Sequence, residues 1–405
     1  MDARIGRMTE QTSALAGLKV VELGTLIAGP YCARLLAEFG ADVVKVETPG
    51  EGDPLRKWRK LHEGNSLWWY AQARNKKSIA INLRDPDGQA VVRRLARDAD
   101  IVVENFRPGT LEKWNLGYEQ LAKDNPKLVM VRLSGFGQTG PYKDRPGFGA
   151  IGESMGGMRY ITGYPDRAPV RVGISIGDSL AAMFGVIGAL MAIHSRAKTG
   201  KGQVVDVALY EAVFAMMESM LPEYGYDGSI RERTGSALPG IVPSNTYRCK
   251  DGQYVVIGAN ADSIFKRMMR GIGLPELADD PELADNAGRT RHTEKLDKVI
   301  GDWCASVTLD EALAVLAKAE VPSGRIYSIA DIAKDLHFQA RGMIERHKLG
   351  DRDLTLPGIV PKLSATPGET KWIGPKLGEH TDEVLASLGY SAADIARLRA
   401  AASIG

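Results

Sequence analysis

Residues 18–47 of the 405-residue chain read LKVVELGTLIAGPYCARLLAEFGADVVKVE, and this stretch decides the fold. A short β-branched run, LKVVEL, is followed by a glycine-containing turn, an apolar-periodic segment over residues 31–39, and a second β-branched run, DVVKVE. Apolar strand-like runs separated by a helix-like segment favour parallel strands that are buried on both faces. The stretch therefore predicts the start of a parallel α/β sheet.

The same alternation continues through the first half of the chain. Strand-like runs recur at residues 77–83, 100–104, 127–133 and 203–207, and helix-like stretches recur at residues 89–98, 180–193 and from 208 to about 221. A doubly wound, Rossmann-like α/β domain is therefore expected. The glycines of residues 24–30 lack the GxGxxG spacing, so neither a nicotinamide nor a flavin cofactor is expected.

The second half of the chain differs from the first in composition and in its pattern of apolar residues. A length of 405 residues exceeds what one hydrophobic core usually serves, so two structural units are expected. Residues 222–245 are rich in Gly, Pro, Ser and charge, which is typical of a linker or a substrate loop. The expected divisions are a flexible N-terminus at residues 1–15, a large domain at 16–221, the linker at 222–245, a small α+β domain at 246–329 and a return segment at 330–405. Within the small domain a hairpin spans residues 246–257, helices lie near residues 262–272, 294–306 and 309–319, and a strand lies at residues 324–328, while a last helix is expected near residues 391–402.

Composition argues against several classes of function. The balance of 52 Lys and Arg against 50 Asp and Glu gives a net charge of +2, which does not support binding to nucleic acid or to an anionic membrane. The longest apolar run, residues 180–193, falls short of the roughly 20 residues that span a bilayer. Six histidines show no metal-ligand spacing, so no metal is expected. Three scattered cysteines, Cys32, Cys249 and Cys304, favour a reducing, cytoplasmic location, and the polar N-terminus does not resemble a signal peptide.

Asp178 is the strongest candidate for chemistry. It lies in the stretch VGISIGDS, residues 172–179, at the start of the expected apolar helix, and it is the only acid between Asp166 and Asp206. Asp is a preferred helix N-cap, but a carboxylate among glycine amides can also act as a nucleophile or base. A helix N-terminus stabilises the carboxylate in either role, so the residues alone leave both interpretations open.

Two further loops follow predicted strands, and each contains residues suited to a ligand. They read NFRPG at residues 105–109 and SGFGQTGP at residues 134–141. Ligands of open α/β sheets bind beyond the carboxyl ends of the strands, although each loop can also be explained as a simple turn. The chain has 45 glycines, against roughly 28 expected at about 7% usage. Glycine allows close approach of backbone to a ligand, and this would explain the excess.

Seven blocks of the sequence, in order, resemble the class III coenzyme A transferases and cover roughly residues 15–400. The blocks are GLKVVELGTLIAGPYCARLLAEFGADVVKVE, NKKSIAINL, ADIVVENFRPG, LSGFGQTGPY, RVGISIGDS, TGKGQVVDVALYEA and LGEHTDEVL. The resemblance implies a transferase that uses coenzyme A (CoA) thioesters as substrates, without a metal or redox cofactor. It also implies an interlaced homodimer, in which the large domain of each chain combines the N-terminal half with the return segment.

By this resemblance, Asp178 is the residue that carries the acyl group. Its carboxylate would attack the donor thioester to give a mixed anhydride, and CoA thiolate would return to form an aspartyl-CoA thioester. The acceptor acid would then take CoA through a second anhydride. The backbone amide of Gly177 is a candidate for stabilising the charge that develops on oxygen, and Glu153 is a further candidate acid.

The matching blocks also place eleven residues along the CoA substrate. Arg and Lys among them suit phosphates, and Phe106 suits an adenine or pantetheine contact, although Arg and Lys are also common on any surface. The residues are Ile27, Ala28, Thr48, Asn82, Leu83, Arg84, Asn105, Phe106, Arg107, Lys113 and Arg145.

Residues 233–243, RTGSALPGIVP, resemble the substrate loop of transferases that move CoA from succinyl-CoA to dicarboxylic acids. The distal carboxylate of such an acid needs a cation or several amides. Arg171, Arg231 and Arg233 are the candidate cations, and Gly240 is a candidate backbone contact in the loop.

Other reactions of the same superfamily, and a non-catalytic CoA-binding regulator, are the alternatives. The racemases carry His and Asp where this chain has PGFGAIGE at residues 146–153, whose first seven positions do not titrate, so proton abstraction lacks its base. The formyl-CoA transferases carry Tyr-Glu where this chain has Phe148-Gly149, and Gln where it has Ile27. The departures leave CoA transfer from succinyl-CoA to a dicarboxylate as the preferred hypothesis.

Overall fold

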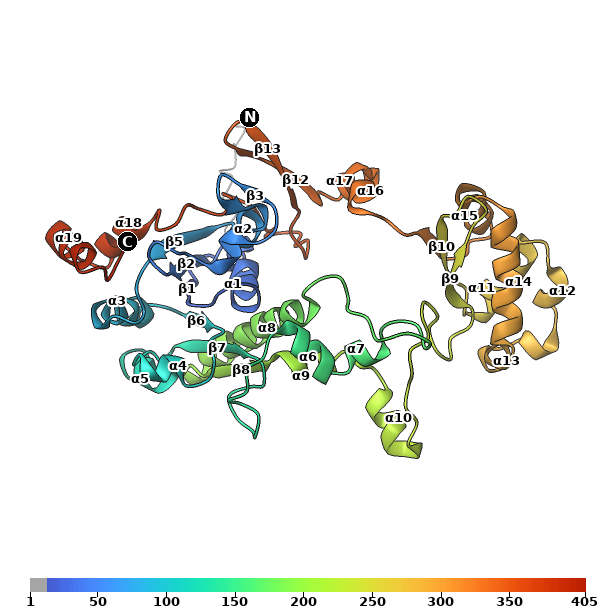
Figure 1. Cartoon of the computed structure of the whole chain (residues 1–405), viewed down its shortest axis with the longest axis horizontal. Coiled ribbons are helices and arrows are strands. Elements are labelled where there is room, and N and C mark those ends of the chain that lie inside the picture. The colour runs from blue at the N-terminus through green and yellow to red at the C-terminus, as the bar shows by residue number, and fades with distance from the viewer. Residues whose placement is uncertain (1–12) are drawn as a thin grey trace, which may run out of the picture. The chain divides into compact units, whose positions relative to one another are not determined.

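The computed structural model describes residues 13–405, and the part of the expected flexible N-terminus at residues 1–12 lies outside the described residues. The chain divides into two compact units, and Figure 1 shows the elements of each. The first unit comprises residues 13–159, Val172–Gly228 and Gly342–Gly405, and the second comprises Tyr160–Arg171 and Ser229–Arg341.

These boundaries differ from the expected ones at two places. Residues 160–171 join the second unit because Arg233 Nη1 donates to the carbonyl of Tyr160 at 2.7 Å and the amide of Gly235 donates to the carbonyl of Gly163 at 2.9 Å. Residues 330–341, which were assigned to the return segment, also belong to the second unit.

Six parallel strands form the sheet of the first unit, in the order β5-β2-β1-β6-β7-β8. The strands are β1 (Lys19–Glu22), β2 (Asp42–Glu47), β5 (Lys76–Ala80), β6 (Ile101–Glu104), β7 (Val129–Ser134) and β8 (Val204–Ala208). The prediction of an α/β fold with a parallel sheet is confirmed. The strand order changes direction between β1 and β6, and ligands of such sheets bind beyond the carboxyl ends of the strands at this switch point.

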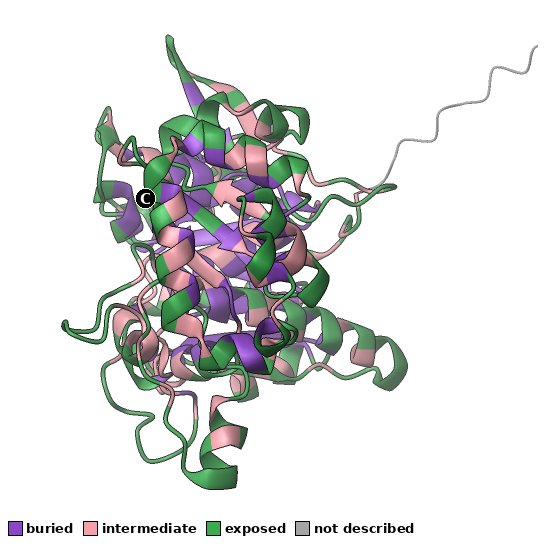
Figure 2. Cartoon of the chain, turned by 90° about the vertical axis from the view of Figure 1, so that its right-hand side faces the viewer, coloured by how far each residue is buried: buried purple, intermediate pink, exposed green. Residues whose placement is uncertain are grey.

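Helices cover both faces of the sheet, so the strands are buried between them in Figure 2. One apolar cluster joins strand residues such as Val21, Val44 and Ile79 to the helices α3, α5, α18 and α19. The other face of the sheet lies against α1 and α8. The lack of a side chain at Gly185 lets α8 approach Val131 on β7 closely. These helices are α1 (Ala28–Glu38), α3 (Pro86–Arg97), α5 (Tyr118–Asp124), α8 (Ile176–Thr199), α18 (Thr381–Ser387) and α19 (Ala392–Ala400).

Local sequence explains why these helices begin where they do. Asp85 is the N-cap of α3, and its carboxylate accepts hydrogen bonds from the amides of Asp87 and Gly88, while Pro86 occupies the first helical position. Proline is tolerated there because the first amide of a helix has no partner within it. Ser391 begins α19 with a capping box that is completed by Asp394.

The apolar helix is longer than the sequence predicted. The expected helix of residues 180–193 is the middle of α8, which has 24 residues. By length and composition alone, α8 is long and apolar enough to span a membrane, unlike any other helix of the described chain. The expectation that this segment does not cross a membrane stays a prediction. In the first unit α8 packs against α1, α9, β7 and β8.

The single helix expected from residue 208 to about 221 is two helices. They are α9 (Leu209–Phe214) and α10 (Met220–Asp227). Glu218 between them has φ of +46°, a left-handed conformation that ends helical geometry. As a result, α10 extends into the residues that were expected to be linker.

Shorter elements complete the first unit. They are η1 (Pro54–Lys57), β3 (Leu61–His62), β4 (Asn65–Ser66), α2 (Leu67–Gln72), α4 (Thr110–Lys113), α6 (Gly149–Met155), α7 (Met158–Ile161, which straddles the unit boundary), β12 (Ile344–Leu349) and β13 (Arg352–Pro357). The return segment is tied to the N-terminal half: Arg56 Nη1 donates to the carbonyl of Pro375 at 3.2 Å, and Arg74 Nη1 donates to that of Pro357 at 2.8 Å.

The second unit is a small α+β fold around its own core. Its antiparallel sheet has the order β11-β10-β9, and the predicted hairpin is present as β9 and β10. Phe265, Met268, Leu296 and Leu316 from its helices are fully buried against Ile257 of the sheet. The elements are β9 (Ser244–Arg248), β10 (Tyr254–Gly258), α11 (Asp262–Gly271), α12 (Pro275–Ala278), η2 (Pro281–Leu283), α13 (Asn286–Arg291), α14 (Thr293–Ser306), α15 (Leu309–Lys318), β11 (Ser323–Arg325), α16 (Ile329–Lys334) and α17 (Leu336–Ala340).

Candidate active site

A cavity of about 500 Å³ opens at the carboxyl ends of β1, β2, β5 and β6, at the switch point of the sheet. Its walls come from the segments that follow these strands and from the end of the chain. The lining residues are Leu23, Thr25, Lys45, Val46, Glu47, Thr48, Pro49, Glu51, Gly52, Asp53, Pro54, Ile81, Asn82, Leu83, Arg84, Phe106, Trp114 and Ala402. We refer to it as the switch-point cavity.

Five of the eleven residues predicted to contact CoA line this cavity. They are Thr48, Asn82, Leu83, Arg84 and Phe106. The ring of Phe106 meets that of Trp114 edge-on, with 5.3 Å between centroids, so the pair forms one aromatic wall. Arg84 is exposed and offers its guanidinium to solvent. The cavity thus combines an aromatic surface with a cation, which suits a nucleotide.

Asn105 also lies at the switch point, but its side chain holds the protein together. Its Oδ1 accepts a hydrogen bond from the amide of Thr25 and its Nδ2 donates to the carbonyl of Thr25, both at 2.8 Å. This pair ties the segment after β1 to the segment after β6. Ile27 and Ala28, at the start of α1, are buried and present no charge.

The other predicted CoA cations do not line the cavity. Arg107 and Lys113 are exposed in and after the segment that carries Phe106, and Arg145 is exposed in the loop after β7. The guanidinium carbon of Arg145 lies 3.7 Å from the ring centroid of Tyr142. A stacked guanidinium of this kind keeps its edge available for other contacts.

Asp178 is not the cap of α8. Ser175 occupies the N-cap position, and Asp178 is the third helical residue, in the first turn. The N-cap interpretation is therefore corrected: the carboxylate sits inside the first turn, where the helix dipole favours negative charge. Because α8 is the crossover between the parallel strands β7 and β8, its N-terminus lies at the carboxyl edge of the sheet.

Gly149, the first residue of α6, packs directly on the Asp178 carboxylate. A Cβ atom at position 149 would lie 2.1 Å from Asp178 Oδ2 and 2.9 Å from its Cγ. No real Cβ tolerates such a distance, so only glycine fits here unless Asp178 moves. The absence of a side chain at Gly149 therefore leaves room for the Asp178 carboxylate.

Glu153 joins the same group of residues. It lies four residues after Gly149, on the same face of α6, and its side chain is 3% exposed. A Cβ at Gly177 would lie 3.1 Å from the carbonyl oxygen of Gly149 and 3.3 Å from Glu153 Cγ. Arg159 Nη2 lies 3.4 Å from Glu153 Oε2. Glu153 is thus a buried, ion-paired residue of the second turn of α6.

Glycines bring the surrounding loops together. A Cβ at Gly135 would lie 2.9 Å from the Cα of Gly147, so the loop after β7 and the segment before α6 touch through backbone. The Gln138 amide donates to Asp206 Oδ2 at 2.9 Å, which fixes the tip of that loop to β8. Gly135 and Gly147 thus allow this backbone contact, and Gly149 is the glycine that contacts Asp178 itself.

The candidate substrate residues Arg171, Arg233 and Gly240 belong to the second unit. Arg233 lies over the ring of Tyr160, at 5.5 Å from the centroid. The carbonyl of Gly240, whose φ is +71°, accepts a hydrogen bond from Asn286 Nδ2 at 2.8 Å. Arg231, the third candidate cation, is half-buried in the same unit.

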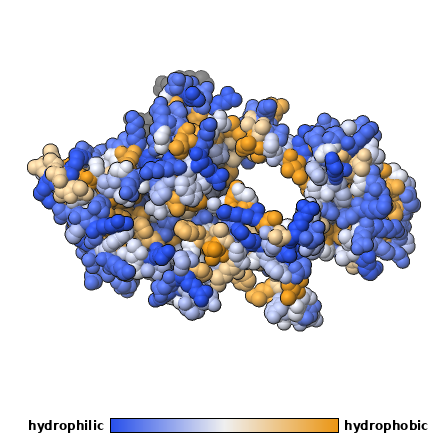
Figure 3. Space-filling view, viewed as in Figure 1, coloured by the Kyte–Doolittle hydropathy of each residue, from blue (hydrophilic) through white to orange (hydrophobic). Residues whose placement is uncertain are grey.

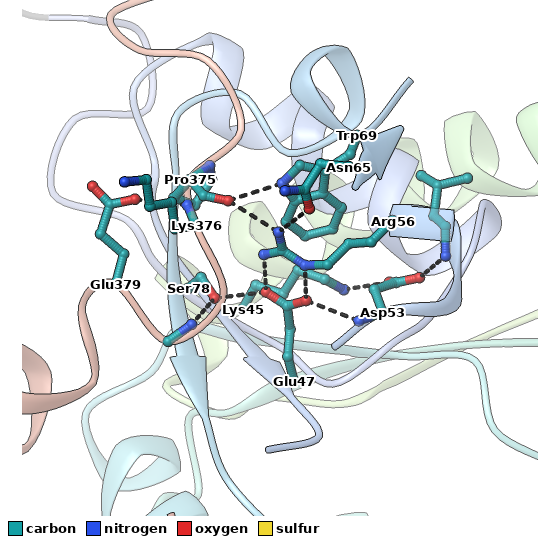
Figure 4. Close-up of polar contacts among 12 residues, drawn as sticks. Lys45, Glu47, Asp53, Arg56, Asn65, Trp69, Ser78, Pro375, Lys376 and Glu379 are labelled. Carbon is teal, nitrogen blue, oxygen red and sulfur yellow. Dashed lines mark hydrogen bonds and ion pairs between the residues drawn. The ribbon is translucent and has the colours of Figure 1, made fainter. Parts of the chain in front are cut away.

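Sequence reasoning missed a group of charged residues beneath the switch-point cavity (Figure 4). Lys45 Nζ lies 2.7 Å from Glu22 Oε1 and 2.9 Å from Asp53 Oδ2, and all three side chains are buried. A signal was present: Glu22 and Lys45 are opposite charges inside two apolar strand runs, and they are neighbours in the β1–β2 register. Paired charges within such runs indicate a buried ion pair.

Glu104 ends β6 just below Phe106. Its carboxylate accepts hydrogen bonds from Arg132 Nε and from the Phe106 amide, both at 2.7 Å. Burial raises the pKa of Glu104 to about 7, although attraction to Arg132 works in the opposite direction. Across residues 13–405, no set of three His, Cys, Asp or Glu side chains is arranged to hold a metal ion.

Comparison with known proteins identifies similar chains over nearly the full length. The sequence model of the family described as CoA-transferase family III matches residues 15–381. A protein of Chloroflexus aurantiacus named succinyl-CoA--D-citramalate CoA-transferase is 53% identical over 389 residues, covering 95% of this chain and 97% of its own. The succinyl-CoA--L-malate CoA-transferase beta subunit of the same organism is 43% identical, over 93% of this chain and 94% of its own. The crystal structure of a CAIB/BAIF family protein from Brucella suis matches with a TM-score of 0.82 and 36% identity, over 93% of this chain and 100% of that one.

Proposed function

This chain belongs to CoA-transferase family III and is a transferase, and from that premise we propose that it moves CoA from succinyl-CoA to a free dicarboxylic acid through intermediates on Asp178. The observation that carries the mechanism is the contact between Gly149 and the Asp178 carboxylate in the first turn of α8. The substrate class rests on the similar proteins, whose names pair succinyl-CoA with D-citramalate and with L-malate.

The proposed reaction runs through four acyl transfers at one carboxylate. An Asp178 oxygen attacks the succinyl-CoA carbonyl, and the C–S bond breaks to give a succinyl-aspartyl anhydride and CoA thiolate. The thiolate attacks the aspartyl carbonyl of the anhydride, which releases succinate and leaves an aspartyl-CoA thioester. The acceptor carboxylate attacks that thioester and expels the thiolate, which finally attacks the acceptor carbonyl and frees Asp178.

The N-terminus of α8 supports these steps electrostatically. The first-turn amides, among them that of Gly177, have no acceptor within the helix and carry the positive end of the dipole. Amides that already point toward a developing oxyanion stabilise it without reorganisation. We assign this role to Gly177, and we assign to Glu153 and Arg159 the structural support of the helix start.

We assign the nucleotide end of CoA to the switch-point cavity. Its volume of about 500 Å³ is typical of a site for part of a large ligand. The aromatic pair Phe106 and Trp114 suits the adenine, and Arg84, with the nearby Arg107 and Lys113, suits the phosphates. Ile27, Ala28, Asn105 and Arg145 do not line the cavity, and we propose them as contacts of other parts of the same substrate.

The acceptor acid carries a second carboxylate in both named relatives. Arg171, Arg231 and Arg233 are the proposed partners of that group, together with the loop that contains Gly240. Arg233 is already held in place by its hydrogen bond to Tyr160, which lowers the entropy cost of binding an anion.

Mass spectrometry of the Asp178 peptide tests the proposal. With succinyl-CoA and no acceptor, the peptide should gain the mass of CoA less one water, and Asp178→Ala should remain unmodified and inactive. Full transfer by Asp178→Ala would exclude the mechanism. Entry of solvent deuterium at the α-carbon without any acceptor would instead indicate a racemase, and tight CoA binding without transfer to any acid would indicate a regulator.

We also propose a cytoplasmic homodimer. Apolar side chains are exposed along α8 and on the α9–α10 segment, where the hydrophobic colour gathers in Figure 3. They are Met183, Ile187, Leu190, Met191, Phe214, Met216 and Leu221. Contiguous exposed apolar surface on a folded chain marks an interaction site. Light scattering should give twice the mass of one chain, and a monomer at micromolar concentration would exclude the homodimer. Assembly with a different subunit would also exclude it, and would resemble the L-malate enzyme, whose name includes a beta subunit.

A further inference from the structure

Six charged side chains are buried beneath the switch-point cavity, between the sheet and α1 and α2. Each is between 0% and 4% exposed, and three positive charges balance three negative ones. They are Lys45, Arg56 and Lys76 together with Glu22, Glu47 and Asp53. Lys45, Glu47 and Asp53 also line the cavity, so the network forms part of its wall.

Asp53 is the member that joins two segments of the cavity wall. Its carboxylate accepts hydrogen bonds from the amide of Leu26, at 3.1 and 3.2 Å, and from the amide of Leu55, at 2.8 Å, and it pairs with Lys45 at 2.9 Å. Leu26 has φ of +65°, a conformation that a non-glycine residue adopts only when its surroundings hold it. Asp53 provides such a hold, because it accepts the hydrogen bond of that same amide.

The segment that contains Asp53 is itself fastened at both ends. Glu47 accepts two hydrogen bonds from Arg56, both at 2.8 Å, and one from the amide of Asp53 at 2.9 Å. Arg56 also stacks on the ring of Trp69, at 3.7 Å from the centroid. Figure 4 shows these contacts converging on Glu47 and Asp53. A satisfied network of this kind fixes one arrangement of the backbone, whereas a broken one leaves buried charges unpaired.

We infer that Asp53 is a positioning residue for acyl-CoA: its carboxylate holds the segment of residues 24–28 and the segment of residues 48–54 at the separation that the nucleotide end of CoA requires. The inference rests on the proposed function, which assigns that end of CoA to the switch-point cavity. Asp53 itself acts through the backbone of Leu26 and Leu55 and through Lys45.

Charge and position predict opposite effects for the loss of the Asp53 carboxylate. CoA is strongly anionic, and the buried network, whose charges sum to zero, does not attract it. Replacing Asp53 by Asn leaves the network with one excess positive charge next to the cavity, so electrostatics alone would tighten CoA binding. Positioning predicts weaker CoA binding. The single side-chain oxygen of Asn cannot accept hydrogen bonds from Lys45 and from the amides of Leu26 and Leu55 as the two oxygens of Asp53 do.

The test compares Asp53→Asn with Glu38→Gln. Glu38 is another buried, ion-paired carboxylate of the same unit, but it lies outside the cavity wall. Calorimetry should give a Kd for CoA about tenfold higher in Asp53→Asn, a change of about 1.4 kcal/mol, and an unchanged Kd in Glu38→Gln. In the transfer assay the KM for acyl-CoA should rise while the KM for the acid and the kcat at saturating acyl-CoA stay within about twofold.

An unchanged or lower Kd in Asp53→Asn would overturn the inference, as would an equal rise in both KM values. If Asp53→Asn folds poorly, the double variant Lys45→Met/Asp53→Asn removes both charges together and avoids an unpaired buried ammonium. The same rise in Kd is expected from it. Wild-type protein that binds no CoA would refute the assignment of the cavity and the inference with it, whereas normal binding by wild type and by both variants would refute the inference alone.

Discussion

The first unit contains buried ion networks at both edges of its sheet, and they serve different purposes. At the amino edge, Glu38 pairs with Arg34 and Arg74, both at 2.6 Å, and Arg74 reaches the carbonyl of Pro357. At the carboxyl edge, Glu47 and Arg56 form an equivalent pair, and Arg56 reaches the carbonyl of Pro375. Both networks tie the N-terminal half to the return segment, but only the second lines the switch-point cavity. The same chemistry thus supports the fold at one edge and supports, in addition, a ligand site at the other.

If the carboxyl edge is organised for catalysis, the largest effect should come from Gly149→Ala. The added methyl would displace the Asp178 carboxylate, which lies 2.1 Å from the position of the new Cβ. A displacement of about 1 Å at a reacting group can cost a hundredfold or more in rate, so kcat should fall by about 10²- to 10³-fold. Steady-state kinetics measures this fall, and circular dichroism should show the helices intact.

Gly225→Ala is the matched control for that variant. Position 225 is also helical, and a Cβ there meets no other atom within 4 Å. Activity should be unchanged, since alanine in a helix costs nothing sterically. Wild-type kcat in Gly149→Ala would contradict the assignment of this contact to the reacting carboxylate.

The amino edge should respond to substitution through stability. Glu38→Ala leaves the fully buried Arg74 without its main partner, which should lower the free energy of unfolding by about 3 kcal/mol. Chemical denaturation measures the loss, and the KM for acyl-CoA of the folded variant should match wild type. A raised KM for acyl-CoA in Glu38→Ala would show that the amino edge also supports the ligand site, which would contradict the difference between the two edges.

A pH effect is expected at the carboxyl edge from Glu104. Burial raises the pKa of this residue to about 7, above the value near 4.3 of an unfolded chain. The folded state therefore holds the proton more tightly, and the associated stability is complete below the unfolded pKa and is lost as the pH rises through about 7. Between pH 5 and pH 8 the loss should be about 2 to 3 kcal/mol.

Glu104→Gln checks this linkage because it cannot titrate. Its free energy of unfolding, followed by denaturant titration over the same pH range, should lack the fall seen in wild type. An identical pH profile in the variant and the wild type would show that another group is responsible.

The smallest effect should come from the exposed cation at the cavity mouth. Arg84→Ala should raise the Kd for CoA about threefold at low salt, with the difference shrinking at high ionic strength. Lys77→Ala, at the amino edge, should leave the Kd for CoA unchanged at both low and high salt. Calorimetry at two salt concentrations separates the two variants.

The sequence predicted the framework because its strands are uniform β-branched runs. LKVVEL, DVVKVE and DIVVE each became a buried strand near the expected residues. It failed at residues 208–221 because the break at Glu218 is a single left-handed residue without a glycine or proline to announce it. It also predicted α8 too short, because the helix extends beyond the apolar run at both ends, over residues 176–179 and 194–199.

The candidate site was predicted only in part, for a reason of geometry. Thr48, Asn82, Leu83, Arg84 and Phe106 were placed by resemblance, and the structure gathers them into one cavity. The contact between Gly149 and Asp178 joins two segments that are far apart in the chain, and the sequence alone does not show that they meet. Asp53 escaped notice because an Asp before Pro54 reads as an ordinary turn, and only the fold brings Lys45 and Leu26 to it.

The return segment has a consequence for the order in which the protein forms during synthesis. Arg56 and Arg74 find carbonyl partners 319 and 283 residues further along the chain, after the whole of the second unit has been translated. We expect the second unit, continuous from residue 229, to acquire protease resistance on the ribosome first, and the first unit to acquire it only after release. Ribosome-bound chains long enough for residue 341 to have left the exit tunnel, with residues 357 and 375 still inside it, should therefore yield a protected fragment from the second unit alone. Early protection of residues 13–159 would disprove this order.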